Sequence, residues 1–173
     1  LSGGGKQVEA RAAFRQLYEA STANGQVQQA AYRGLILSSG AEGLGLATRA
    51  IAEGPPPAQA AALQLVRELG LPGATAAFSG LLNSLGPVVK VALIEGLALR
   101  ADPAATSAVA VQTRDNSPEV RLAALNALGT LGRAAEVSLL AETSVAGTAA
   151  EKATAQQSLA QLRGEDVQKE LTR

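Results

Sequence analysis

The chain repeats its pattern of apolar side chains every 31 residues, and this period limits its possible folds more than any other feature. One column of the repeat reads Ala31, Ala62, Leu93, Ala124 and Ala155. Four residues later the column reads Leu35, Val66, Leu97, Leu128 and Leu159. The register passes through five copies without an insertion. A repeat of this length is typical of solenoids, in which each unit buries its apolar face against its neighbours.

Each copy has room for two helices. The chain is 47% apolar but only 2% aromatic, so its core must consist mainly of Ala, Leu and Val. Ala and Leu are strong helix formers, and no segment shows the sustained alternation of a strand. We expect second helices to begin near Gly25, Pro57, Pro87, Pro118 and Ala149. We expect first helices over residues 6–24, 41–53, 73–84, 103–113 and 134–143. The fold class is therefore all-α.

Two helix starts carry explicit capping signals. Ser117 precedes Pro118 and Glu119, the order of an N-cap, a first-turn proline and an acid at the positive end of the helix dipole. Thr148 and Glu151 have the spacing of a capping box. Both signals coincide with predicted second helices, which supports the register of the repeat.

The segment that runs from Asn116 to Gly129, NSPEVRLAALNALG, resembles bacterial HEAT repeats of the phycobilisome-lyase type. Looser copies begin at Pro57 and Pro87, and the resemblance extends over about residues 25–163. It implies a right-handed α-solenoid of about five helix pairs. This repeat serves many unrelated functions, so the resemblance specifies the fold rather than an activity.

The expected organisation is one solenoid domain over residues 6–173. Its repeats cover about 6–40, 41–71, 72–102, 103–133 and 134–164, followed by a tail over 165–173. Residues 1–5, LSGGG, have the composition of a linker or an expression remnant.

One polar column follows the edge of the apolar arc of the second helices and reads Gln28, Gln59, Lys90, Arg121 and Lys152. It can be a basic ladder for anionic ligands or a set of structural contacts between repeats. The resemblance favours the structural interpretation, because in HEAT-like repeats a basic residue here reaches an acid in the loop before its helix. Asp115 has that spacing from Arg121, and the two are predicted to brace adjacent repeats.

The outward face of the second helices would line the concave surface of such a solenoid. Its candidate partner-binding residues are Arg33, Arg67, Val91, Glu95, Leu99, Leu122 and Asn126. Val91, Leu99 and Leu122 form a modest apolar centre between polar flanks, the profile of a partner groove. The alternative is that these three side chains fill the tight inner curve of the solenoid.

The composition argues against catalysis within the chain. There is no His and no Cys, which removes Ser-His-Asp and Cys-His chemistry and the usual zinc ligands. No phosphate-binding or nucleophile motif occurs, and the glutamates share no common spacing. We therefore predict no catalytic, cofactor-binding or metal-binding residues and no cofactor.

Fifteen basic and fifteen acidic residues give no net charge, which argues against a nucleic-acid partner. The predicted function is a protein-interaction scaffold, as a module of a larger bacterial protein. The alternatives are a chromophore-lyase-like subunit and an accessory module of a multidomain exported enzyme. The partner is expected to be a protein or peptide, and no segment is long and apolar enough to span a membrane. The resemblance implies an extracytoplasmic bacterial location, since similar repeats occur in exported proteins, although no signal peptide is visible in this sequence.

Overall fold

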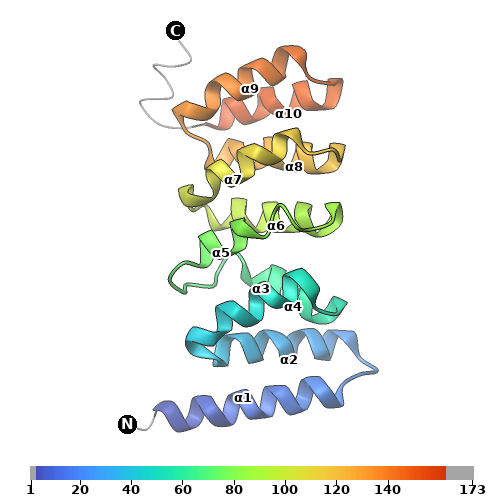
Figure 1. Ribbon diagram of the computed structural model, residues 1–173, viewed down its shortest axis with the longest axis vertical. Coiled ribbons are helices and arrows are strands. Elements are labelled where there is room, and N and C mark those ends of the chain that lie inside the picture. The colour runs from blue at the N-terminus through green and yellow to red at the C-terminus, as the bar shows by residue number, and fades with distance from the viewer. Residues whose placement is uncertain (1–2, 163–173) are drawn as a thin grey trace. The chain divides into compact units, whose positions relative to one another are not determined.

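The computed structural model describes residues 3–162, which contain ten α-helices, three short 3₁₀ helices and no strand (Figure 1). The chain is all-α, as predicted. Its contacts divide it into two compact units, Leu1–Ala77 and Phe78–Arg173. The single domain over 6–173 and the right-handedness of the stack remain predictions, and the predicted tail over 165–173 lies outside the described residues.

The first unit consists of α1 (Gly3–Ala20), α2 (Gly25–Ser38), η1 (Gly40–Glu42), α3 (Gly43–Glu53) and α4 (Pro56–Leu65). Its boundary with the second unit falls within α5 (Ala74–Gly80). Within the unit, α2 packs against both α1 and α4, and α3 packs against α4. Helix α1 begins at Gly3, so residues 3–5 are helical where their composition predicted a linker.

Glycine at position 34 allows α1 and α2 to approach closely. A Cβ atom at Gly34 would lie 2.5 Å from the ring of Phe14, so the ring occupies the space of the missing side chain. On the same two helices, the rings of Tyr18 and Tyr32 are tilted relative to each other, with centroids 5.1 Å apart. The oxygen of Asn24 accepts hydrogen bonds from the amides of Gln26 and Val27 and caps α2.

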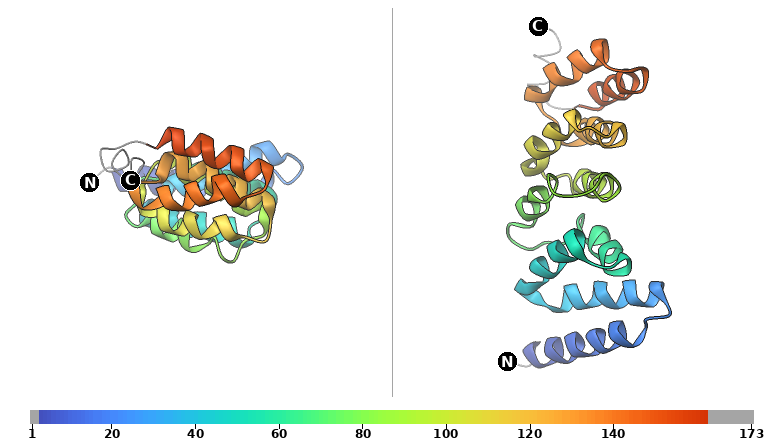
Figure 2. Two further views of the ribbon diagram at one scale, coloured as in Figure 1. Left: turned by 90° about the horizontal axis from the view of Figure 1, so that it is seen from above. Right: turned by 45° about the vertical axis from the view of Figure 1, so that its right-hand side comes forward.

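The second unit contains α6 (Pro87–Arg100), η2 (Pro103–Ala105), α7 (Thr106–Val111), η3 (Gln112–Arg114), α8 (Pro118–Leu131), α9 (Ala134–Ala146) and α10 (Ala149–Gln161). Helix α8 packs against α6 and α10, while α7 packs on α8 and α9 on α10. Figure 2 shows these helices as antiparallel pairs, with α6, α8 and α10 stacked on one side and α7 and α9 on the other. The unit is thus a stack of helix pairs.

The second helices begin at Gly25, Pro56, Pro87, Pro118 and Ala149, at intervals of 31 residues. Ser117 accepts from the amide of Val120, as predicted. The predicted capping box is confirmed, because Thr148 accepts from the amide of Glu151 and the Glu151 carboxylate accepts from the amide of Thr148.

Two of the first helices, α5 and α7, are much shorter than the second helices that follow them. Helix α5 has only seven residues, and α7 has six residues between two 3₁₀ turns. Asp102 caps the first of these turns through the amide of Ala104, 3.0 Å away. The short helices still pack because the second helices supply most of the large core side chains of this unit, including Leu93, Leu97, Leu125 and Leu128.

Candidate partner-binding groove

The carboxyl-terminal halves of α6, α8 and α10 come together on one side of the second unit. Gly129 permits the close approach of α8 to α10, since a Cβ atom there would lie 2.6 Å from Oε1 of Gln161 and 3.1 Å from Cα of Ser158. The buried hydroxyl of Ser158 donates to the carbonyl oxygen of Leu125 at 2.8 Å. This contact connects the two helices directly beneath the surface.

Two adjoining hollows lie over this junction. The first has a volume of about 620 Å³ and is lined by Glu95, Ala98, Leu99, Ala101, Asn126, Thr130 and Gln161. The second has a volume of about 410 Å³ and is lined by Ala101, Pro103, Gly129, Thr130, Leu131, Gly132, Arg133 and Gln161. They share Ala101, Thr130 and Gln161, so they form one surface, here called the α6–α8–α10 groove.

The described lining of the groove combines one large exposed apolar side chain, Leu99, with uncharged polar ones. Leu99 is 69% exposed, unlike most leucines of the second unit. Asn126, Thr130 and Gln161 are also exposed and offer both donors and acceptors. Among the described residues of the lining, the charged side chains are those of Glu95 and Arg133. This lining suits a polypeptide segment better than a highly charged ligand.

The structure brings together three of the seven residues predicted for the concave face, because Glu95, Leu99 and Asn126 line the first hollow. Val91 and Leu122 are half-buried and line neither hollow. The apolar centre expected from three residues is therefore reduced to Leu99 in this groove.

The other two predicted residues belong to the first unit. Arg33 forms an ion pair with Glu68, 2.6 Å from Nη2 to Oε1, on a half-exposed surface. Arg67 is exposed. Arg133 was not predicted as a site residue, because it follows Gly132 beyond the end of α8 and lies on the wheel of no second helix.

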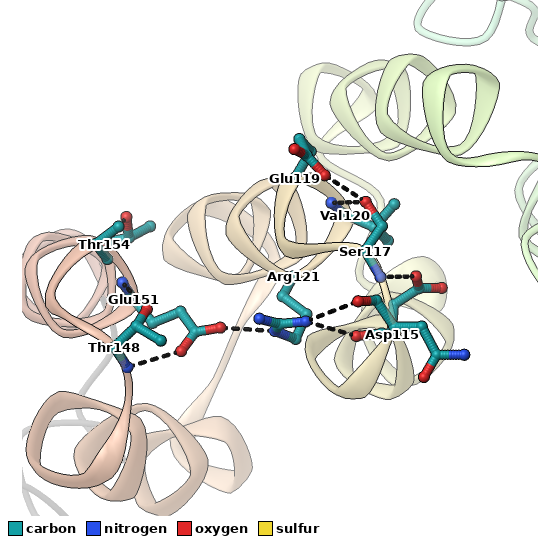
Figure 3. A network of polar contacts seen from close by, with 10 residues as sticks. Asp115, Ser117, Glu119, Val120, Arg121, Thr148, Glu151 and Thr154 are labelled. Atoms are coloured by element: carbon teal, nitrogen blue, oxygen red, sulfur yellow. Dashed lines mark hydrogen bonds and ion pairs between the residues drawn. The ribbon is translucent and has the colours of Figure 1, made fainter.

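The polar column of the second helices makes structural contacts in the second unit. Nε of Arg121 lies 2.6 Å from Oε1 of Glu151, and its Nη1 donates to the carbonyl oxygens of Asp115 and Asn116 (Figure 3). The predicted partners Arg121 and Asp115 thus meet, but through a backbone carbonyl. The Asp115 carboxylate instead forms an ion pair with Lys90 of the preceding repeat, at 2.6 Å. We call these contacts the inter-repeat brace.

The amide side chains of the same column contact the backbone in the first unit. Gln28 donates to the carbonyl of Tyr18 at 3.3 Å, and Gln59 donates to that of Ile51 at 2.8 Å. Both carbonyls lie in the last turn of the first helix of the repeat, where no intrahelical donor remains. These two glutamines therefore cap the first helices of the first unit.

Hydrogen bonds in the brace lower the pKa of its carboxyl groups. The amide of Thr148, followed by the guanidinium of Arg121, lowers the pKa of Glu151 to about 2. The ammonium group of Lys90 lowers the pKa of Asp115, and the amide of Ser117 adds to the effect. Both groups are mostly buried and ionised at neutral pH, so the brace is a pair of charged contacts.

Within residues 3–162, no cluster of three or more metal-ligating side chains occurs. Across the same described part of the chain, no helix has the length and apolar character needed to cross a bilayer.

Comparison with known families identifies one match. A family model described as HEAT repeats matches residues 76–160, from α5 to α10. The match covers every residue of the groove lining except Gln161. No curated protein matches the chain.

Proposed function

Since residues 76–160 of this chain are HEAT repeats, we propose that it is a non-catalytic protein-interaction module that binds a partner segment in the α6–α8–α10 groove. HEAT repeats as a class mediate protein–protein interactions. The observation that supports this groove is the 69% exposure of Leu99 within a hollow of about 620 Å³. Burial of an exposed leucine by a partner is favourable by roughly 1.5–3 kcal/mol.

The polar lining suits an extended segment. The Asn126 and Gln161 amides can each donate and accept hydrogen bonds, and Thr130 can do both through its hydroxyl. A segment outside regular secondary structure has free backbone N–H and C=O groups that need such partners. An apolar side chain of the segment would lie on Leu99 while its backbone contacts the polar side chains.

The groove is built on a rigid support. Leu97, Leu125 and Leu128 are at most 1% exposed and lie on the same helices as the lining residues. Gly129 and Ser158 hold α8 against α10 through close contact and a buried hydrogen bond. A surface held in place before binding loses little conformational entropy when the partner binds.

The test is to select 12-residue peptides from a displayed random library against the wild-type protein and to measure their affinity by fluorescence anisotropy. Leu99→Asp should weaken the selected peptides at least tenfold, because it places a charge where an apolar contact forms. Val88→Asp is the matched control, since Val88 lies on the same helix, is 84% exposed and does not line the groove.

Equal binding by the wild-type, Leu99→Asp and Val88→Asp proteins would refute the proposal. Circular dichroism and thermal unfolding of both variants should match the wild type, because both side chains are exposed. If Leu99→Asp unfolds the protein, hydrogen exchange of the wild type provides the second test. Bound peptide should then protect the ends of α6 and α8 in preference to α9.

The chromophore-lyase alternative leads to a separate measurement. A lyase-like subunit should change the absorption spectrum of a bilin added to the purified protein, whereas an interaction module should leave it unchanged. The wider proposal of a module within a larger bacterial protein is tested by reading the parent gene on either side of this chain.

A further inference from the structure

We infer that the segment bound by the α6–α8–α10 groove carries one basic and one acidic residue, on either side of an apolar residue that contacts Leu99. This inference rests on the proposed function and specifies the chemistry of the partner. It is based on the two charged side chains in the groove lining, neither of which has a partner among residues 3–162.

Glu95 supplies the negative charge. It lies on α6 at the surface, and its carboxylate makes no ion pair or hydrogen bond with any described residue. The other described residues that line the first hollow are uncharged. A basic side chain of the partner that binds Glu95 would therefore not be repelled by a cationic side chain among these lining residues.

Arg133 supplies the positive charge in the second hollow. Its backbone amide donates to the carboxylate of Glu136, 2.7 Å away, at the start of α9. Its exposed guanidinium has no hydrogen-bond or ion-pair partner within residues 3–162. Glu136 is the acidic residue nearest to Arg133 along the chain. One of its carboxylate oxygens already accepts from the backbone amide of Arg133. A carboxylate of the partner can therefore bind here in the fork geometry that arginine favours.

Glu95 and Arg133 differ from the charged residues of the inter-repeat brace. Lys90, Asp115, Arg121 and Glu151 belong to the same unit, and their charges are paired at 2.6 Å. Within residues 3–162 the two charges of the groove have no ion-pair partner, and each lies in the part of the lining that the hollows do not share.

Opposite charges in the two hollows would fix the direction of the bound segment. In one direction its basic residue meets Glu95 and its acidic residue meets Arg133. In the reverse direction both contacts join like charges, which is unfavourable. Exposed ion pairs are individually weak, so the charges specify sequence and direction while Leu99 supplies most of the affinity.

The experiment uses the peptides selected against the wild-type protein, measured at low ionic strength. Selected sequences should contain one Lys or Arg and one Asp or Glu around an apolar residue. Glu95→Arg should weaken binding about fivefold, and changing the basic residue of the peptide to Glu should restore it. Arg133→Glu should behave in the same way toward the acidic residue of the peptide.

Glu142→Arg is the matched control, because Glu142 is exposed on α9 and lines neither hollow. Suppose that Glu95→Arg weakens binding no more than Glu142→Arg while Leu99→Asp still weakens it at least tenfold. The charge inference is then wrong, and the groove is still the binding site. If no compensating peptide restores affinity, the inference is also wrong. If Leu99→Asp and Val88→Asp bind the selected peptides equally well, the proposed function itself is wrong.

Discussion

Replacing Glu151 with Gln should destabilise the protein at neutral pH by an amount that shrinks as the solution is acidified. The two oxygens of this carboxylate accept from the Arg121 guanidinium at 2.6 Å and from the Thr148 amide at 2.8 Å. Gln has nearly the same shape as the protonated acid, but it offers one acceptor oxygen in place of two. It therefore retains one contact and loses the charge that strengthens both.

The magnitude follows from the pKa of Glu151, which is lowered from 4.5 in the free group to about 2 in the folded protein. Because the folded value lies below the unfolded one, the charge stabilises the fold above pH 4.5 and loses its effect as pH falls toward 2. At pH 7 the full shift corresponds to about 3 kcal/mol. By pH 3 less than half, about 1.4 kcal/mol, remains.

The assay is urea unfolding of both proteins at pH 7, 5, 4 and 3, followed by circular dichroism. Asp115 and Glu119 also have lowered pKa values, but they are present in both proteins and cancel in the difference. Arg121→Met, alone and combined with Glu151→Gln, measures the coupling of the pair, which should be about 1–2 kcal/mol. The same destabilisation at pH 7 and pH 3 would contradict the role assigned to this charge.

Two further predictions concern the packing of the helices. Truncating Leu125 or Leu128 to Ala should lower the free energy of unfolding by about 2–5 kcal/mol each, because both side chains are fully buried, and near-zero cost at both positions would mean that these leucines are not core. Gly129→Ala should cost about 1–3 kcal/mol through its contact with Ser158, whereas Gly45→Ala, which meets no atom within 4 Å in α3, should stabilise by up to about 1 kcal/mol; thermal unfolding of both variants checks the opposite signs.

The sequence was sufficient to locate the second helices because local chemistry marks their starts. Pro87, Pro118 and Ala149 begin helices where they were predicted to, after capping or turn residues that act within four positions. The first helices depend more on tertiary packing. Six residues between two 3₁₀ turns, as in α7, form too short a helix for propensity to define its ends.

The groove was only partly predictable, for a geometrical reason. A helical wheel placed Glu95, Leu99 and Asn126 on the outward face, and these residues do line a hollow. The same wheel does not show how much of a side chain the neighbouring helices bury. Val91 was placed on the outward face but is half-buried. The wheel could not place Arg133, because this residue lies outside the second helices.

The brace shows why a strictly periodic rule for ion pairs fails in this chain. Lys90 pairs with an acid 25 residues later, in the loop before α8, whereas Arg121 pairs with one 30 residues later, in the first turn of α10. The position 30 residues after Lys90 is Val120, and the position 25 residues after Arg121 is Ala146. Each cation thus has one acid within reach, at a different place in the following repeat.

Gln28, Gln59 and Arg121 of this column each contact the backbone of the segment that precedes their own helix. Gln28 and Gln59 donate to carbonyls in the last turn of the first helix, whereas Arg121 donates to the carbonyls of Asp115 and Asn116 in the loop that follows η3. Only the longer cationic side chains also extend to an acid of the next repeat, and Arg121 makes both contacts because its guanidinium has several donors. Arg121→Gln should therefore keep a contact with the backbone that precedes α8 and lose the ion pair with Glu151 that connects the two repeats.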